Sequence, residues 1–216
     1  MRFDLVVFDL DGTLIDSRGD IAGAADAALA AFGLPSWPDE IIESMVGEGA
    51  RLLVERAIAG RLPPERTDDV FRRYAEHYGA HRTDRTTVYP GVREGLSRLD
   101  PARRFIATNK PAPLARAIVE DLGLGPFFDG VLGDGDVERR KPDPAMLGEA
   151  MRRAGVPRER TVYVGDGPID LQTADRAGVP LILVDWGFRK EEVAEARPAF
   201  RAGSFDEIVA IVRGDG

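Results

Sequence analysis

Acidic side chains stand at the ends of two short apolar runs of this sequence. Asp9 and Asp11 follow the first run, and Asp166 and Asp170 follow a later one. Four carboxylates that meet at one place repel each other unless a cation binds among them. Ligation by oxygen, without histidine or cysteine, suits a hard ion, and Mg²⁺ is the natural candidate. The pattern therefore predicts a magnesium site at these four aspartates.

Donor and cationic groups occupy comparable positions. A third apolar run ends in Thr108, Asn109 and Lys110, and Lys141 precedes the helix that leads into the run before Asp166. A hydroxyl and a lysine beside a metal ion suit a phosphoryl group, whose equatorial oxygens need positive and donor partners. We therefore expect a site for a phosphate ester, with Asn109 and Lys110 among the residues that bind the substrate.

The first acidic pair has the spacing of a nucleophile and an acid–base group. Asp9, nearest the strand, could attack the phosphorus, and Asp11 could protonate the leaving oxygen and later activate water. Gly12 and Thr13 follow directly and are expected to bind the substrate. Each of these residues alone would fit a turn, a helix cap or a surface charge. Their order and their common position at strand ends carry the prediction.

Short apolar runs alternate with helical patterns along most of the chain. Continuous apolar runs indicate strands covered on both faces, as in a parallel sheet. Apolar residues at helical spacing, each series closed by a glycine, indicate crossover helices at 114–122, 146–154 and 171–177. The alternation predicts a doubly wound, mostly parallel, Rossmann-like α/β sheet whose strand-end loops form the ligand site. The expected strands are Leu5–Phe8, Phe105–Ala107, Val162–Val164, Leu181–Val184 and a less regular run at Gly130–Leu132.

One long stretch interrupts this alternation. About 90 residues without a convincing strand separate the first run from the next, and helical patterns fill them. A crossover needs one helix, so several imply an inserted helical unit. We expect an α/β core at 1–15 and 87–216 and a helical domain at 16–86. The expected helices of this domain are 21–32 after an Asp20 cap, 41–46, 50–58 and 70–78.

Composition restricts the classes of partner. With 44% hydrophobic and 31% charged residues the chain fits a globular protein rather than a disordered one. The net charge of −8 disfavours nucleic acid and anionic membranes as partners. There is no cysteine, which excludes disulfides and thiolate chemistry. The first apolar stretch is too short for a signal peptide or a membrane span, so we expect a cytoplasmic protein.

The order of the motifs resembles that of a known family. The run Phe8–Leu14 is similar to the first motif of the haloacid dehalogenase (HAD) superfamily, and the resemblance covers essentially the whole chain. Thr108, Lys141-Pro142 and Gly165-Asp166 with Asp170 are similar to its second, third and fourth motifs, in that order.

The resemblance implies a role for each matched residue. Asp9 would form an aspartyl-phosphate, and Asp11 would be the general acid and base, with its backbone carbonyl reaching the metal. Thr108 would hydrogen-bond the phosphoryl oxygens, and Lys141 would balance charge between nucleophile and phosphate. Asp166 would ligate Mg²⁺, with Asp170 ligating or acting through a water. The helical insertion corresponds to the family's mobile cap.

Two features narrow the reaction within that family. Dehalogenating relatives have no acid two residues after the nucleophile, whereas this chain has Asp11. Phosphonate-cleaving relatives use a cap lysine, and residues 16–86 contain no lysine. Phosphate-ester chemistry remains.

The chain also contains the segments Met45–Arg51, Tyr89–Val92, Thr108–Lys110 and Gly133–Asp136. These four segments resemble bacterial phosphoglycolate phosphatases. The resemblance implies 2-phosphoglycolate as the substrate, with Gly47 and Arg51 as substrate-binding residues. Paired glycines let backbone amides approach a small ligand, and an arginine can hold a carboxylate in two-pronged fashion. An ordinary interhelical turn and a solvated helix face are the alternatives for these two residues.

Several rival functions stay open at this point. Within the superfamily they are a broader sugar-phosphate phosphatase, a pyrophosphatase and a phosphoglucomutase-like transferase. Outside it they are a phosphate-accepting switch similar to bacterial receiver domains, and an inactive fold used for interaction. The first-motif run and the helical insertion argue against the switch, and the intact motifs argue against the inactive fold. His77 and His81, four residues apart, can bind zinc, but no third ligand is evident nearby.

Overall fold

A computed structural model describes residues 1–215. The chain divides into two compact units, one formed by Met1–Ile15 with Val88–Gly216 and the other by Asp16–Thr87. We call the first the α/β unit and the second the helical unit. No helix in the described part of the chain is both long enough and apolar enough to cross a membrane.

The α/β unit contains a six-stranded sheet in which every neighbouring pair of strands is parallel. Its strand order is β5-β4-β1-β6-β7-β8, so β1 lies inside the sheet and successive crossovers leave it in both directions. This order creates a topological switch point at β1, where the carboxyl-end loops diverge. The strands are β1 (Leu5–Phe8), β4 (Arg103–Pro111), β5 (Gly130–Asp134), β6 (Thr161–Gly165), β7 (Leu181–Val184) and β8 (Phe200–Ala202).

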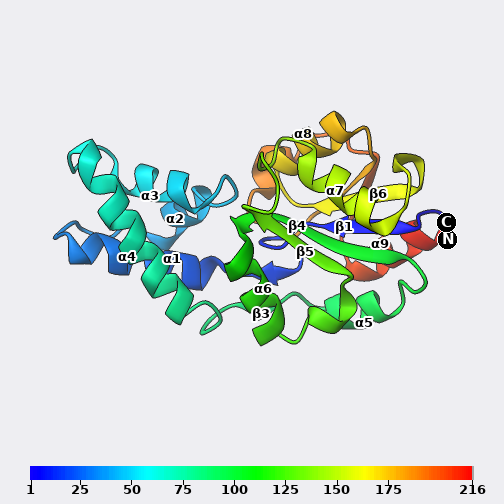
Figure 1. Ribbon diagram of the computed structural model, residues 1–216, viewed down its shortest axis with the longest axis horizontal. Helices are drawn as coiled ribbons and strands as arrows, with labels where there is room; N and C mark the ends of the chain where they lie inside the picture. Colours follow the sequence, from blue (N-terminus) through cyan, green and yellow to red (C-terminus); the bar gives the residue numbers. More distant parts are fainter. Residues whose placement is uncertain (216) are drawn as a thin grey trace. The chain divides into compact units, whose positions relative to one another are not determined.

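Helices cover both faces of this sheet. In Figure 1, α7 and α8 lie on one face, while α5 and α9 lie on the other, and the two chain termini lie side by side. Strand residues alternate between these faces: Leu5 and Val7 enter the core cluster that contains Met146 and Leu147 of α7, whereas Phe8 stacks on Phe205 of α9 at 5.9 Å. The helices are α5 (Val92–Ser97), α6 (Ala112–Asp121), α7 (Ala145–Ala154), α8 (Pro168–Ala177) and α9 (Phe205–Arg213).

The predicted doubly wound α/β class is confirmed, and the expected strands all form. All residues of β1, β6 and β7 are buried, as the continuous apolar runs indicated, and β1 and β7 have the expected bounds. β4 is longer than predicted because it continues through Thr108–Lys110 to Pro111. The edge strand β8 and the helices α5 and α9 were not among the expected elements. Short 3₁₀ turns occupy Pro64–Arg66, Gly125–Phe127, Arg158–Arg160 and Lys190–Val193.

The helical unit contains α1 (Arg18–Ala31), α2 (Asp39–Ser44), α3 (Ala50–Ile58) and α4 (Thr67–Ala80). Small and apolar residues line the buried side of α1, among them Ile21, Ala25 and Leu29, and α4 buries Val70, Tyr74 and Tyr78. Two short strands that the sequence did not indicate, β2 (Ile15–Asp16) and β3 (Thr87–Val88), pair with each other where the chain enters and leaves this unit.

The prediction that Asp20 caps the first helix of this unit is wrong. The helix begins at Arg18 with Ser17 as its N-cap, and Asp20 lies in its first turn. The buried Asp20 carboxylate instead accepts hydrogen bonds from the Arg85 amide at 3.0 Å and from the Thr86 amide and hydroxyl at 2.8 and 2.6 Å. One side chain therefore fastens the start of α1 to the segment that leaves the unit, a long-range contact that local spacing cannot reveal.

Candidate active site

Three adjacent strands bring the chemical groups to one edge of the sheet. β1 lies between β4 and β6, with Phe8 paired to Ile106 on one side and to Val164 on the other. Asp9 therefore follows β1 at the level of Ala107, one residue before Thr108 on β4, and of Gly165, which closes β6. The Asp9 amide extends this register by donating to the Val164 carbonyl at 2.8 Å. Strand register thus gathers Asp9, Thr108 and Asp166, whereas Lys141 reaches the same place from the loop before α7 and Asp170 from the first turn of α8.

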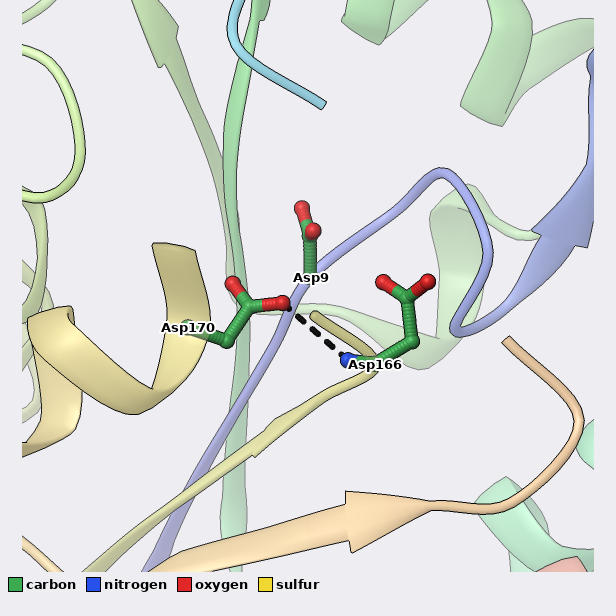
Figure 2. A group of neighbouring side chains, drawn as sticks. All are labelled: Asp9, Asp166 and Asp170. Carbon is green, nitrogen blue, oxygen red and sulfur yellow. Dashed lines mark hydrogen bonds between the residues drawn. The ribbon is translucent and has the colours of Figure 1, made fainter. Parts of the chain in front are cut away.

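Asp9, Asp166 and Asp170 form an acidic cluster. One carboxylate oxygen from each lies within 4.8 Å of the others, and no other group of three metal-binding side chains is found among the residues that the structure describes. Figure 2 shows the carboxylates of Asp9 and Asp166 pointing the same way, while Asp170 turns an oxygen toward the Asp166 backbone nitrogen. Oxygen atoms at this spacing form a set that could hold a metal ion.

The electrostatics of the cluster fit a cation. Burial raises the pKa of the Asp9 carboxyl; Lys141 opposes this shift, and Asp170 adds to it. Burial likewise raises the pKa of Asp166, with Asp170 and Asp9 contributing. Both carboxyls are thus pushed toward their neutral forms by the protein alone, and a divalent ion would favour the charged forms. Hard oxygen donors together with unrelieved repulsion fit an ion of the Mg²⁺ type.

Within the cluster, Asp170 is the most heavily hydrogen-bonded member. Its Oδ2 accepts from the amides of Asp166 and Gly167 at 3.0 and 3.1 Å, and its Oδ1 accepts from Lys141 Nζ at 2.9 Å and from Tyr163 Oη at 2.5 Å. Each oxygen thus already has two donors, which matches its usual capacity. Asp9 and Asp166 have more acceptor capacity left for an ion.

Lys141 neutralises part of this negative charge. Its side chain is 2% exposed, and Nζ lies 2.8 Å from Asp9 Oδ1 and 2.9 Å from Asp170 Oδ1. Burial opposes the charge of the lysine, but Asp170 and Asp9 more than compensate and raise its pKa. The lysine therefore stays protonated, with its charge directed at the carboxylate predicted to be the nucleophile.

A second ion pair lies beside the first. Lys110 Nζ is 3.2 Å from Asp11 Oδ1, and the lysine side chain is only 4% exposed. The Thr108 hydroxyl accepts from the Lys110 amide at 3.2 Å, and Asn109 Nδ2 donates to the Lys141 carbonyl at 3.0 Å. The Asn109 bond links the end of β4 to the Lys141 loop, and the Thr108 bond holds two neighbouring site residues of β4 to each other.

Gly12 allows the first loop to approach the acidic cluster. Its φ is +81°, and a Cβ built there would meet Asp166 Oδ2 at 2.4 Å. A side chain at this position would therefore require both an unfavourable backbone and a displaced carboxylate. Next to it, the Thr13 hydroxyl donates to Asp166 Oδ1 at 3.5 Å. The first loop consequently packs directly on the fourth-motif aspartate.

Gly47 and Arg51 belong to the helical unit, apart in sequence and unit from the residues above. Gly47 has a φ of +113°, and Arg51 lies in the first turn of α3. The Arg51 guanidinium pairs with Asp68, lies 3.6 Å from Glu55, and sits over the Phe71 ring at 5.6 Å from its centroid. Half of its side chain is exposed. The helical unit thus already supplies anionic partners to this arginine.

His77 lies in the last turn of α4 and His81 is the C-cap residue that follows it. Their ring centroids are 4.5 Å apart, and His81 Nδ1 lies 2.8 Å from Asp84 Oδ2. In the described part of the chain, no group of three metal-binding side chains includes either histidine. Burial lowers the pKa of His77, and the neighbouring His81 adds to the shift.

Two residues that support the site were not predicted from the sequence. The Phe188 amide donates to Asp166 Oδ2 at 2.8 Å, and the fully buried Tyr163 bonds to both Lys141 and Asp170. No local pattern marks a backbone amide from a distant loop. Tyr163 did carry a signal, because a tyrosine inside an apolar strand needs a partner for its hydroxyl when it is buried.

Comparison with known proteins agrees with this geometry. The family model described as haloacid dehalogenase-like hydrolase matches residues 3–178, and the chain belongs to this family. It is 39% identical over 207 residues to the phosphoglycolate phosphatase of Pseudomonas syringae pv. tomato, covering 90% of this chain and 74% of that protein. It is 35% identical over 213 residues to the phosphoglycolate phosphatase of Mesorhizobium japonicum, covering 96% and 94%.

A solved structure shares the fold over the whole length. The crystal structure of a predicted phosphoglycolate phosphatase from Haemophilus somnus matches with a TM-score of 0.91 and 26% identity, over 98% of each chain. The resemblance to the HAD superfamily found in the sequence is therefore confirmed, and the protein is a hydrolase of that class.

Proposed function

We propose that this protein is a Mg²⁺-dependent phosphatase that hydrolyses 2-phosphoglycolate to glycolate and phosphate. The observation that carries the proposal is the position of Asp9. Its carboxylate lies in the acidic cluster with Asp166, and the same side chain contacts Lys141 at 2.8 Å. The names of the two relatives described above support the choice of substrate.

In the proposed reaction, Asp9 is the nucleophile. One of its carboxylate oxygens attacks the phosphorus, the bond to the ester oxygen breaks, and an aspartyl-phosphate forms. Asp11 gives its proton to the leaving glycolate oxygen and then accepts a proton from the water that hydrolyses the aspartyl-phosphate. Phosphate leaves, and both aspartates return to their starting states.

Asp9, Asp166 and the Asp11 backbone carbonyl would hold the magnesium ion, with Asp170 ligating or acting through a water. When bound, the ion supplies positive charge to the phosphoryl oxygens. Lys141 keeps charge balance at Asp9. The Thr108 hydroxyl, with Gly12 and Thr13, would bind the phosphoryl oxygens, and Asn109 and Lys110 would complete the substrate pocket.

We assign the helical unit the role of a cap that excludes water and selects the leaving group. Gly47 would let a backbone amide approach the substrate, and Arg51 would bind its carboxylate. Arg51 is already paired with Asp68. Substrate binding by this residue therefore requires an exchange of one carboxylate partner for another. The cytoplasmic location expected from the sequence stays a prediction.

Phosphate release from a panel of short esters, with and without Mg²⁺, tests the proposal. We expect turnover that needs the ion and favours 2-phosphoglycolate over sugar phosphates, pyrophosphate and p-nitrophenyl phosphate. Equal activity on sugar phosphates would replace the substrate assignment with a broader phosphatase. Phosphorylation without turnover would instead indicate a phosphate-accepting switch.

A further inference from the structure

Tyr163 places a phenol hydroxyl in the interior of the α/β unit, directly behind the acidic cluster. The residue lies in β6, its register partner on β1 is Val7, and its side chain is fully buried in the core cluster beside α7. The other β6 residues around it, Val162 and Val164, are apolar. A hydrophobic side chain would fill this position without a hydrogen bond, so the hydroxyl requires an explanation.

The hydroxyl contacts two charged groups at once. Lys141 Nζ donates to Tyr163 Oη at 2.8 Å, and Tyr163 Oη donates to Asp170 Oδ1 at 2.5 Å. Lys141 also donates to the same Asp170 oxygen at 2.9 Å. The three groups therefore form a closed triangle of hydrogen bonds in which each member contacts both others.

The triangle and Asp9 together provide an acceptor for each ammonium hydrogen of Lys141. An ammonium group has three N–H donors. In this site the three acceptors of Lys141 are Asp170 Oδ1, Tyr163 Oη and Asp9 Oδ1 at 2.8 Å. With two donors held by the triangle, the third is directed at Asp9. The lysine has few other orientations that satisfy all three donors in a buried place.

Asp170 anchors the other side of the triangle. Its Oδ2 is held by the amides of Asp166 and Gly167 at the start of α8, so the carboxylate cannot rotate without losing these bonds. Gly165 makes this packing possible, because a Cβ built there would meet the Asp170 side chain at 2.5 Å. Tyr163 and Lys141 therefore bond to a fixed oxygen.

We propose that Tyr163 is a positioning residue for the reaction, and that its hydroxyl holds Lys141 in the orientation that directs the third ammonium hydrogen at Asp9. The proposal rests on the proposed function only in taking Asp9 as the nucleophile. Without the hydroxyl, one donor of Lys141 loses its acceptor and Asp170 Oδ1 loses one of its donors. Lys141 can then tilt, and Asp9 loses a fixed orientation toward the phosphorus, which a reaction in line with the leaving group requires.

Tyr163→Phe tests the proposal because it removes one oxygen atom and keeps the ring. Thr161→Val is the matched control: Thr161 lies in the same strand, is fully buried, and donates its hydroxyl to the Pro157 carbonyl at 2.9 Å, away from the charged groups. We expect kcat of Tyr163→Phe to fall by about 10- to 100-fold with KM changed less than about threefold, because substrate contacts remain. The control should keep kcat within about twofold.

The loss should be the same for 2-phosphoglycolate and p-nitrophenyl phosphate, since Tyr163 acts on the nucleophile and not on the leaving group. A kcat of Tyr163→Phe within twofold of the wild type, or an equal loss in Thr161→Val, would overturn the proposal. So would a raised KM at unchanged kcat, because the hydroxyl would then serve binding. A wild-type protein that releases no phosphate from any ester would refute the proposed function first, and this inference with it.

Circular dichroism and thermal melting establish that the variants are folded. If Tyr163→Phe does not fold, Tyr163→Met replaces it, because a flexible thioether side chain fills a similar volume without a hydroxyl. The same separation of kcat from KM is expected for this variant. Retained kcat in folded Tyr163→Met would count against the proposal in the same way.

Discussion

Each unit of this protein contains a cationic side chain with a predicted function, and Lys141 and Arg51 differ in burial and in their partners. Lys141 of the α/β unit is 2% exposed and has three hydrogen-bond acceptors within 2.9 Å. Arg51 of the helical unit is half exposed, and its partners Asp68 and Glu55 are themselves 71% and 46% exposed. A charge in a buried network has one orientation and interacts strongly, whereas an exposed pair is screened by water and exchanges partners easily. The first arrangement suits chemistry at a fixed atom, and the second suits substrate selection.

Of the changes considered, replacement of the nucleophile in the buried site should lower turnover most. We expect Asp9→Asn to lower kcat by at least about 10⁴-fold while the protein remains folded, because an amide cannot form the aspartyl-phosphate. Phosphate release measures the loss. Asp4→Asn in the same unit, which removes an exposed pair with Arg160, serves as the control and should keep wild-type turnover. Substantial turnover by Asp9→Asn would mean that another residue attacks the phosphorus.

Removal of the metal should abolish the activity of the buried site, and the loss should be reversible. EDTA is expected to abolish phosphate release, and added Mg²⁺ is expected to restore it. Burial, with the neighbouring Asp170 carboxylate, raises the pKa values of Asp9 and Asp166, and a bound cation would favour the charged forms that ligate it. Activity that survives thorough chelation would contradict the metal assignment. A melting temperature that rises with Mg²⁺ concentration would give a second measurement, independent of turnover.

The acid–base group should matter less than the nucleophile. We expect Asp11→Asn to lower kcat by about 10²-fold or more, because the leaving oxygen is no longer protonated by a positioned acid. Mg²⁺ affinity should change little, since the proposed ligand from this residue is its backbone carbonyl. The loss should be smaller for p-nitrophenyl phosphate, whose leaving group needs less protonation. An equal loss on both esters would remove Asp11 from the role of general acid.

The helical unit also contains a buried carboxylate, Asp20, whose expected contribution is to stability and not to catalysis. We expect Asp20→Ala to lower the free energy of unfolding by about 2–4 kcal/mol, because the Arg85 and Thr86 amides lose their acceptor. Denaturant titration measures this change. Asp68→Asn, at an exposed pair of the same unit, should change stability far less. Equal effects of the two substitutions would mean that burial does not distinguish them.

Replacement of Arg51 should have the smallest effect on the kinetics. We expect Arg51→Ala to raise KM for 2-phosphoglycolate by about three- to tenfold and KM for p-nitrophenyl phosphate by less, with kcat nearly unchanged, because the residue would contact only the substrate carboxylate. Steady-state kinetics on both esters decide this. The same change on both would assign Arg51 to the solvated face of α3, in agreement with its pair to Asp68.

The local pattern of apolar residues predicted an element correctly where the residues of one segment were sufficient to determine its structure. β1 and β7 have the predicted bounds because continuous apolar runs can be buried only inside a covered sheet. α3 likewise occupies the predicted residues. β8 was not predicted because three residues at a sheet edge carry no apolar run. The helix α9 did have a signal, since Ser204 followed three residues later by Glu207 is a pattern of helix starts. In the structure the Ser204 hydroxyl accepts from the Glu207 amide.

The amino-acid sequence by itself determined the family, the strand-end position of Asp9, Asp11 and Asp166, the position of Lys141 before a helix, and the order in which these motifs follow each other. Only the tertiary structure decided which groups touch. It alone joined Asp20 to Thr86 and Tyr163 to Lys141 and Asp170. The physical reason is that hydrogen bonds between residues far apart in the chain depend on sheet register and burial, which arise only when the elements pack together.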